Sequence, residues 1–171
     1  MKKTVLLFGL ASGALAAGMM LLGMRLAMAH GYRVAETVGF TSIVLSSLLV
    51  FFGVRSHRER EGGLRFGRGF AVGAAICGTA CAVYALTWGV TSLWLLPDLP
   101  AKLATCMVDQ ARADGKSDKE IAETMRQAEE MRRMEANPFL NVGEAFLEPL
   151  PFGLAAALIA AAVLRRRPAA G

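Results

Sequence analysis

Histidine and cysteine are scarce in this sequence, which has two histidines and three cysteines among 171 residues. Structural zinc usually takes four ligands of these two types. Cys77 and Cys81 stand one helical turn apart with no further ligand near them in the sequence, and Cys106 has no neighbouring cysteine. We therefore expect no metal site. Two cysteines at i and i+4 in a straight helix are also poorly placed for an ordinary disulfide.

Motifs for catalysis and cofactor binding are absent as well. No nucleophile stands beside a general base at a spacing typical of an active site. Two glycine clusters, at residues 62–63 and 67–69, resemble nucleotide loops, but no strand precedes them, as such a loop requires. The sequence therefore predicts no catalytic residue and no cofactor, and it disfavours an enzyme.

Long apolar runs are what the sequence does contain. Hydrophobic residues make up 54% of the chain, and four apolar runs cover roughly residues 5–24, 38–54, 70–96 and 145–164. About 20 residues of helix cross the roughly 30 Å hydrocarbon core of a bilayer. The runs lack the alternation of barrel strands, so helices are expected. The predicted fold is all-α: an integral membrane four-helix bundle in a single domain.

Basic residues cluster beside the apolar runs, on one side of the predicted topology. Lys2 and Lys3 precede the first run, five arginines lie between residues 55 and 68, and three more follow the fourth run at residues 165–167. The positive-inside rule makes this side cytoplasmic, with both termini inside. These positions account for the net charge of +5 without a nucleic-acid partner, and the lipid bilayer is the expected partner.

An alternative treats residues 1–29 as a cleaved signal peptide. Lys2 and Lys3 supply the charged start, and residues 27–29 (AMA) resemble a cleavage site. The apolar run of about 20 residues is longer than the roughly 7 to 15 that are typical of such peptides. A retained first span is therefore favoured.

The segment from residue 97 to 138 is predicted to be an external amphipathic helical hairpin between the third and fourth spans. Its first helix ends at Asp114-Gly115, which is a helix-stop signal. Its second helix opens with Ser117 followed three residues later by Glu120, the spacing of a capping box. Asn137-Pro138 then ends the second helix.

This hairpin has two possible roles. It can cover the external ends of the spans, or it can dock a partner, either a second copy of this chain or another envelope protein. Methionine-rich faces adapt to partners because the thioether side chain is flexible. The candidate partner surface is Met107, Met125, Met131 and Met134. A copper relay is disfavoured, because no histidine accompanies these methionines.

Small residues recur at every fourth position of the third span. Such a face lets a second helix approach closely in lipid. The residues of this face are Gly69, Gly73, Cys77, Cys81, Ala85 and Gly89. The first span has a similar face at Gly9, Gly13 and Ala17. We expect spans one and three to pack together through these faces.

A group of charged residues is predicted near the external interface. Its members are Arg25, Arg33, Glu36, Glu144 and Glu148. Glu148 precedes Pro149, and prolines near a helix start remove backbone amides and can break the first turn. Glu148 paired with Arg25 or Arg33 would form a gate to a small path. The alternative is that these carboxylates only favour a helix start through the helix dipole.

The order of these features resembles one known family. A second span ends in a basic link at Arg55–Glu61, residues 62–70 (GGLRFGRGF) lead into a glycine-rich third span, and residues 96–99 (LPDL) open a charged helical segment before the last span. This pattern is similar to the bacterial membrane proteins grouped as domain of unknown function 4199. The resemblance implies a four-span protein of the bacterial cytoplasmic membrane, and it supplies no catalytic residues.

Two functions remain open from the sequence. The favoured one is a non-enzymatic scaffold or accessory subunit that engages a partner through the external hairpin. The other is a small transporter or channel component that uses the interfacial carboxylates. Four helices enclose only a narrow path, so this second function is expected to require an oligomer.

Overall fold

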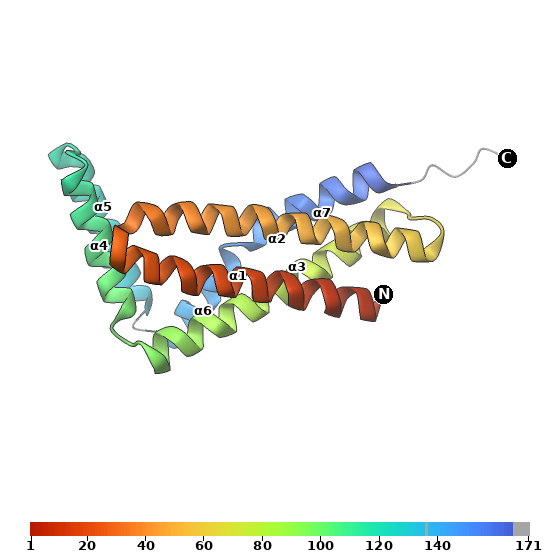
Figure 1. The fold of residues 1–171 in the computed structure, drawn as a ribbon, viewed down its shortest axis with the longest axis horizontal. Helices are drawn as coiled ribbons and strands as arrows, with labels where there is room; N and C mark the ends of the chain where they lie inside the picture. Colours follow the sequence, from red (N-terminus) through yellow and green to blue (C-terminus); the bar gives the residue numbers. More distant parts are fainter. Residues whose placement is uncertain (136, 166–171) are drawn as a thin grey trace.

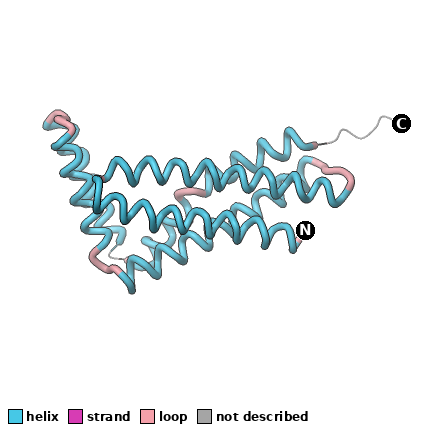
Figure 2. The backbone as a smooth tube through the Cα atoms, viewed as in Figure 1, coloured by secondary structure: helices cyan, strands magenta, loops and turns pink. Residues whose placement is uncertain are grey.

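The computed structural model describes residues 1–135 and 137–165, except for the side chains of residues 134 and 135. Every regular element in these residues is a helix (Figures 1 and 2). The helices are α1 (Lys2–His30), α2 (Tyr32–Glu61), α3 (Phe66–Val90), the short π-helix η1 (Thr91–Leu95), α4 (Leu99–Ala113), α5 (Asp118–Glu135), α6 (Pro138–Leu147) and α7 (Leu150–Leu164). The all-α class is confirmed.

Four helical segments of the described chain are long and apolar enough to cross a membrane, as the sequence predicts. They are Lys2–His30, Tyr32–Glu61, Phe66–Leu95 and Pro138–Leu164. These segments extend beyond most of the limits predicted from hydropathy; α2, for example, begins at Tyr32 instead of residue 38. Hydropathy marks only the part of a helix that suits lipid, whereas the backbone hydrogen bonds continue into charged ends.

The four candidate spans pack into one bundle. Helices α1 and α2 lie side by side, α3 packs against α1, and α7 packs against both α3 and α2. The N terminus, the α2–α3 link and the end of α7 lie at one end, whereas α4 and α5 lie across the other end (Figure 1). We call these the link end and the α4–α5 end.

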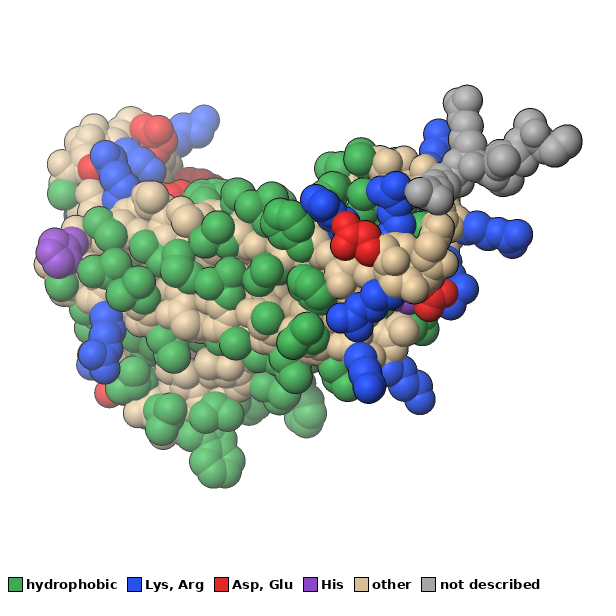
Figure 3. All heavy atoms as spheres, turned by 45° about the vertical axis from the view of Figure 1, so that its right-hand side comes forward, with side chains coloured by type: hydrophobic (Ala, Val, Ile, Leu, Met, Phe, Trp, Pro, Cys, Tyr) green, Lys and Arg blue, Asp and Glu red, His purple; other side chains and the backbone are tan. Residues whose placement is uncertain are grey.

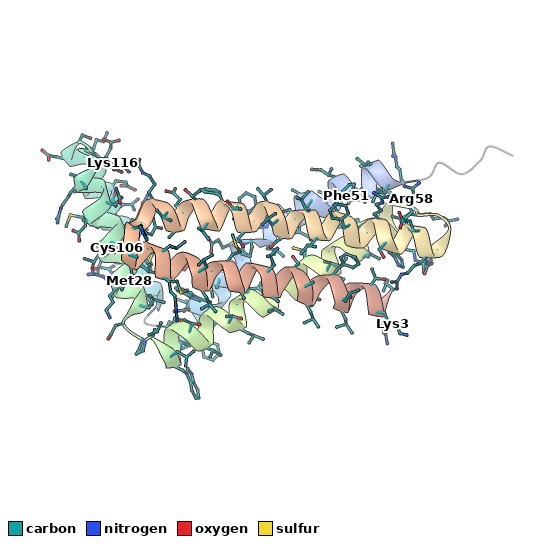
Figure 4. All side chains as sticks on the ribbon, viewed as in Figure 1. Lys3, Met28, Phe51, Arg58, Cys106 and Lys116 are labelled. Atoms are coloured by element: carbon teal, nitrogen blue, oxygen red, sulfur yellow. The ribbon has the colours of Figure 1, made fainter. Side chains whose placement is uncertain are left out.

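Charged side chains gather at the two ends of the molecule. Figure 3 shows a band of apolar side chains between a cluster of Lys and Arg at the link end and a mixed cluster over α4 and α5. Lys3 and Arg58 lie at the link end and Lys116 at the opposite end (Figure 4). The basic residues 166 and 167 lie outside the described part. This banded surface is typical of a protein that spans a bilayer.

A single residue connects α1 to α2. Gly31 has φ of +93°, a backbone conformation that favours glycine because it has no Cβ. Its amide donates to the carbonyl of Ala27 at 2.9 Å, which closes α1. The two helices therefore form a tight antiparallel pair from the start of the chain.

The best-packed core lies toward the link end. Val54, Val72 and Ile76 are fully buried there, with Ala157 of α7 against them. His57 is also buried, at 1% exposure, and its Nε2 has no hydrogen-bond partner in the described part of the protein. This half of the bundle is closely filled, and it is apolar apart from buried polar residues such as His57 and Thr4.

Spans one and three pack together as predicted, but only the small-residue face of α1 lies in that contact. Gly13 of α1 does lie against α3, because a Cβ at Gly13 would be 2.6 Å from the Cβ of Val83. The small-residue face of α3, however, turns to α7: a Cβ at Gly73 would be 2.6 Å from the Cβ of Ala157. Helix α3 therefore contacts α1 on one side and α7 on another, and the alanine-rich α7 packs against the small-residue face of α3.

Two further glycines show the same arrangement, in which the face of α1 contacts α3 and the face of α3 contacts α7. Gly9 of α1 faces Thr79, whereas Gly69 of α3 faces Leu64 and Ala161. Cys77 and Cys81 are buried, and their sulfur atoms lie 3.9 Å apart as free thiols. Gly153 of α7 packs directly onto the Cys77 side chain. The two cysteines therefore serve close packing between α3 and α7.

Helices α4 and α5 pack against each other between the third and fourth spans. The predicted capping box forms at their junction. The Ser117 hydroxyl lies 2.6 Å from Glu120 Oε2, and that carboxylate accepts from the Ser117 amide at 3.0 Å. These two hydrogen bonds lower the pKa of Glu120. The placement of this helix pair outside the membrane stays a prediction.

Candidate functional site

The fourth candidate span is broken inside the bundle. Helix α6 ends at Leu147 and α7 begins at Leu150, with Glu148 and Pro149 between them (Figure 2 draws this junction as a loop). Pro149 and Pro151 have no amide hydrogen, so the helical ladder cannot run through them unbroken. Both prolines lie at the start of α7, so the fourth candidate span is interrupted at a helix start.

The break lies alongside α3, well within the length of that helix. Glu148 itself is an exposed residue, and its expected position near the external interface stays a prediction. The Leu150 carbonyl lies 3.8 Å from the sulfur of Cys77. Cys77 lies eleven residues after the first residue of α3, Phe66, which corresponds to about 16 Å along a helix. Leu150 therefore lies well inside the third candidate span, Phe66–Leu95, and away from both of its ends.

Beside this break is a cavity of about 350 Å³. It is bordered by α1, α2, α3, one residue of α4 and the α6–α7 junction, and its size is within the range of small-molecule sites. Its polar lining consists of Ser12, Tyr32, Glu36, Ser42, Ser46, Ser47, Tyr84 and Glu148. No Lys, Arg or His side chain is among the described residues that line it. The bundle cavity, as we call it, is therefore mainly apolar, with hydroxyl groups and two carboxylates in its lining.

The acidic and phenolic groups of the cavity converge. Tyr32 lies within electrostatic range of both Glu36 and Glu148, and Tyr84 lies within range of Glu148. Glu148 forms no ion pair with any described residue. Glu148 belongs to the candidate span Pro138–Leu164. In lipid, a carboxylate within a span is costly unless it binds a proton or a cation, and such residues commonly mark functional sites.

Serine hydroxyls close the cavity at mid-bundle. Ser12 donates to the carbonyl of Ser46 at 3.2 Å, and Ser46 donates back to the carbonyl of Ser12 at 3.5 Å. Ser42 also lines the cavity and is 7% exposed. In contrast to Ser12 and Ser46, its hydroxyl has no hydrogen-bond partner among the described residues. Ser42 is therefore available to a bound molecule.

The five charged residues predicted as one interfacial site are separated. Glu36, Glu144 and Glu148 are all exposed, but only Glu36 and Glu148 line the bundle cavity; Glu144 lies one turn before Glu148 and outside it. Arg25 borders a different surface depression, with Lys102. Arg33 does not line the bundle cavity either.

The expected pairing of Glu148 with Arg25 or Arg33 does not form. Arg33 instead lies 2.7 Å from Asp114, in the turn after α4. Hydrogen bonds from Gln110 and Arg33 lower the pKa of Asp114. Arg33 turns away from the bundle interior because the exposed α4–α5 turn offers it a carboxylate that remains hydrated.

The predicted methionine surface is only partly exposed. Met125 is 49% exposed, but Met107 and Met131 are half-buried. The side chain of Met134 lies outside the described residues. Ala104 of α4 and Ala128 of α5 are buried, so much of the apolar face of this helix pair is already covered.

Sequence reasoning missed most residues of the cavity. Tyr32, Tyr84 and Trp88 face it from α2 and α3, and serines face it from α1 and α2. One signal was present: four serines lie in the first two apolar runs, where hydroxyls need partners. Their convergence depends on how the helices rotate, which hydropathy does not report.

The four long apolar helices indicate a multi-pass helical membrane protein, and two carboxylates line the cavity beside its interrupted fourth span. A model of the family described as "Protein of unknown function (DUF4199)" matches residues 6–166, which is nearly the whole chain. The chain belongs to this family, as the order of its spans and links indicated. No curated protein and no solved structure matched it significantly.

Proposed function

We propose that this protein is a small non-enzymatic transporter or channel component that binds its solute between Glu36 and Glu148. The observation that carries this proposal is the bundle cavity, which brings two carboxylates together at an interrupted span. Interrupted spans with binding groups near mid-bilayer are a recurrent device of membrane transporters. A carboxylate there can exchange a proton for another cation.

Proton flux into proteoliposomes tests this proposal without a known solute. A potassium diffusion potential drives protons inward, and an enclosed pH-sensitive dye reports them. We expect the protein to raise the flux above that of protein-free liposomes, and Glu148→Gln to return it to that baseline. Glutamine keeps the size of the side chain but cannot release a proton.

Glu144→Gln is the matched control, because Glu144 is one turn away and outside the cavity. This variant is expected to keep the wild-type flux. A Glu148→Gln flux equal to wild type, or a wild-type flux equal to that of empty liposomes, would contradict the proposal.

The same proposal includes an orientation in the bacterial cytoplasmic membrane. The link end carries Lys2, Lys3 and most of the arginines between residues 55 and 68, so it faces the cytoplasm. The bundle cavity extends toward the opposite end, where Tyr32 and Glu36 begin α2. The cavity is thus reached from the external side.

A second candidate function is a scaffold that engages a partner through α4 and α5. Its supporting observation is the exposure of Met125 on a helix pair that stands across the end of the bundle (Figure 1). It is the weaker candidate, because the buried alanines of α4 and α5 leave little apolar surface. It requires this pair to face outward, which the labelling experiment in the Discussion tests.

A further inference from the structure

The charge of the bundle cavity limits what it can bind. Glu36 and Glu148 line it, and no basic side chain of the described residues does. A negatively charged solute would therefore be repelled by both carboxylates, with no basic group among the described lining residues to offset the repulsion. A positively charged solute instead supplies the counter-charge that Glu148 does not receive from any described residue.

Aromatic rings add a second attraction for positive charge. Trp88 lines the cavity beside Tyr32 and Tyr84. The faces of such rings attract cations, most strongly when the cation has left water, and they commonly recognise quaternary ammonium groups. The carboxylates and these rings border the same volume, so one cation can contact both.

The rest of the lining is apolar and adaptable. Met19, Met20 and Met24 face the cavity from α1, and Phe40 faces it from α2. Methionine side chains fit irregular apolar shapes. A small hydrated metal ion would leave these residues without a partner, whereas an organic cation with an apolar body would contact them.

We infer that the bundle cavity binds a lipophilic organic cation. Its charge lies between Glu36 and Glu148 against the aromatic rings, and its apolar body contacts the methionines of α1. Ser42 lines the cavity, its hydroxyl has no partner among the described residues, and it accepts a hydrogen bond when the cation is a protonated amine. This inference rests on the proposed function and names its substrate class.

The chain contains its own reporter for such binding. It has two tryptophans, of which Trp88 lines the cavity and Trp94 is 84% exposed. A Trp94→Phe variant therefore leaves Trp88 as the single tryptophan. Its fluorescence is titrated in detergent with benzyltrimethylammonium, with the uncharged isostere neopentylbenzene, and with the anion phenylmethanesulfonate.

We expect benzyltrimethylammonium to change the Trp88 fluorescence saturably, with an affinity at least tenfold above that of either other compound. Glu148→Gln and Glu36→Gln should each weaken cation binding about tenfold or more, and Glu144→Gln should leave it unchanged. Each variant is first checked for a single peak in size-exclusion chromatography. Two carboxylate variants are used so that one remains informative if the other does not fold.

Equal binding of the cation and neopentylbenzene overturns the cation assignment but leaves a solute site, so the proposed function survives. Preference for the anion, or cation binding that both glutamine variants retain, overturns the assignment as well. Absence of binding by all three compounds overturns it too. The proposed function fails separately, when the proton flux of the wild-type protein equals that of empty liposomes.

Discussion

Two glycines of α3 illustrate how much the surroundings of a single residue decide. Gly73 is pressed against Ala157, whereas Gly78 has no atom within 4 Å of the position of a Cβ. The sequence shows both as glycines in an apolar helix and does not distinguish them. Only the approach of α7 makes one of them indispensable.

Gly73→Ala is expected to lower the unfolding midpoint of the purified protein in detergent. The added methyl group overlaps Ala157, and such overpacking typically costs about 1–3 kcal/mol. Gly78→Ala is the matched control and should be neutral or stabilising, since alanine favours a helix by up to about 1 kcal/mol over glycine. Equal midpoints for the two variants would show that the α3–α7 contact is not as close as described.

At the scale of elements, a single ion pair ties the start of α2 to the turn after α4. Arg33 and Asp114 are 2.7 Å apart, and Gln110 donates to the other oxygen of Asp114 at 2.9 Å. These contacts lower the pKa of Asp114. A lowered folded-state pKa means that the stabilisation is complete above the ordinary pKa, about 4, and is lost as the pH falls through the lowered one.

We therefore expect amide protection at residues 110–117, corrected for intrinsic exchange, to decrease when the pH is lowered from 6 to 3. Hydrogen exchange followed by mass spectrometry measures it. At both pH 6 and pH 3, Asp114→Asn should show the reduced amide protection that we expect of the wild-type protein at pH 3. Asp109→Asn is the control, because Asp109 pairs with Arg112 on its own helix. If amide protection in the wild-type protein did not change between pH 6 and pH 3, a stabilising role of the Arg33–Asp114 pair would be ruled out.

The elements themselves were largely predictable, and the break in the fourth span was not. Hydropathy indicated four spans because each of them contains a long run of apolar residues. Ser117 and Glu120 indicated the start of α5. Pro149 and Pro151 signalled a disturbance. Its place within the span was missed because α6 is itself apolar, so the span extends back to Pro138 and includes Glu148.

For the whole molecule, the relative position of the ends is fixed, and the side each faces is a prediction from charge. In a Cys106→Ser background, a membrane-impermeant maleimide should label Lys116→Cys in intact bacterial spheroplasts. Arg60→Cys, at the link end, should be labelled only after permeabilisation. Cys77 and Cys81 are buried, so they should contribute little background.

The reverse labelling pattern would show that the link end faces outward and the α4–α5 end faces the cytoplasm. It would also exclude a scaffold function that uses α4 and α5 on the external side. Labelling at both positions in intact spheroplasts would contradict a retained four-span topology. Such global features follow from charge near the spans. The cavity, by contrast, depends on helix rotation and on which faces α3 offers to α1 and α7, and neither is encoded in local pattern.

The Ser12–Ser46 pair and the packed core beyond it make the cavity a dead end. On the link side of Cys77, α3 continues for eleven residues to Phe66, about 16 Å of closely filled apolar interior. A solute at Glu148 therefore has no continuous aqueous route onward. Passage requires α7 to part from α3, so turnover would follow the microsecond-to-millisecond pace of helix rearrangement and not the rate of an open pore.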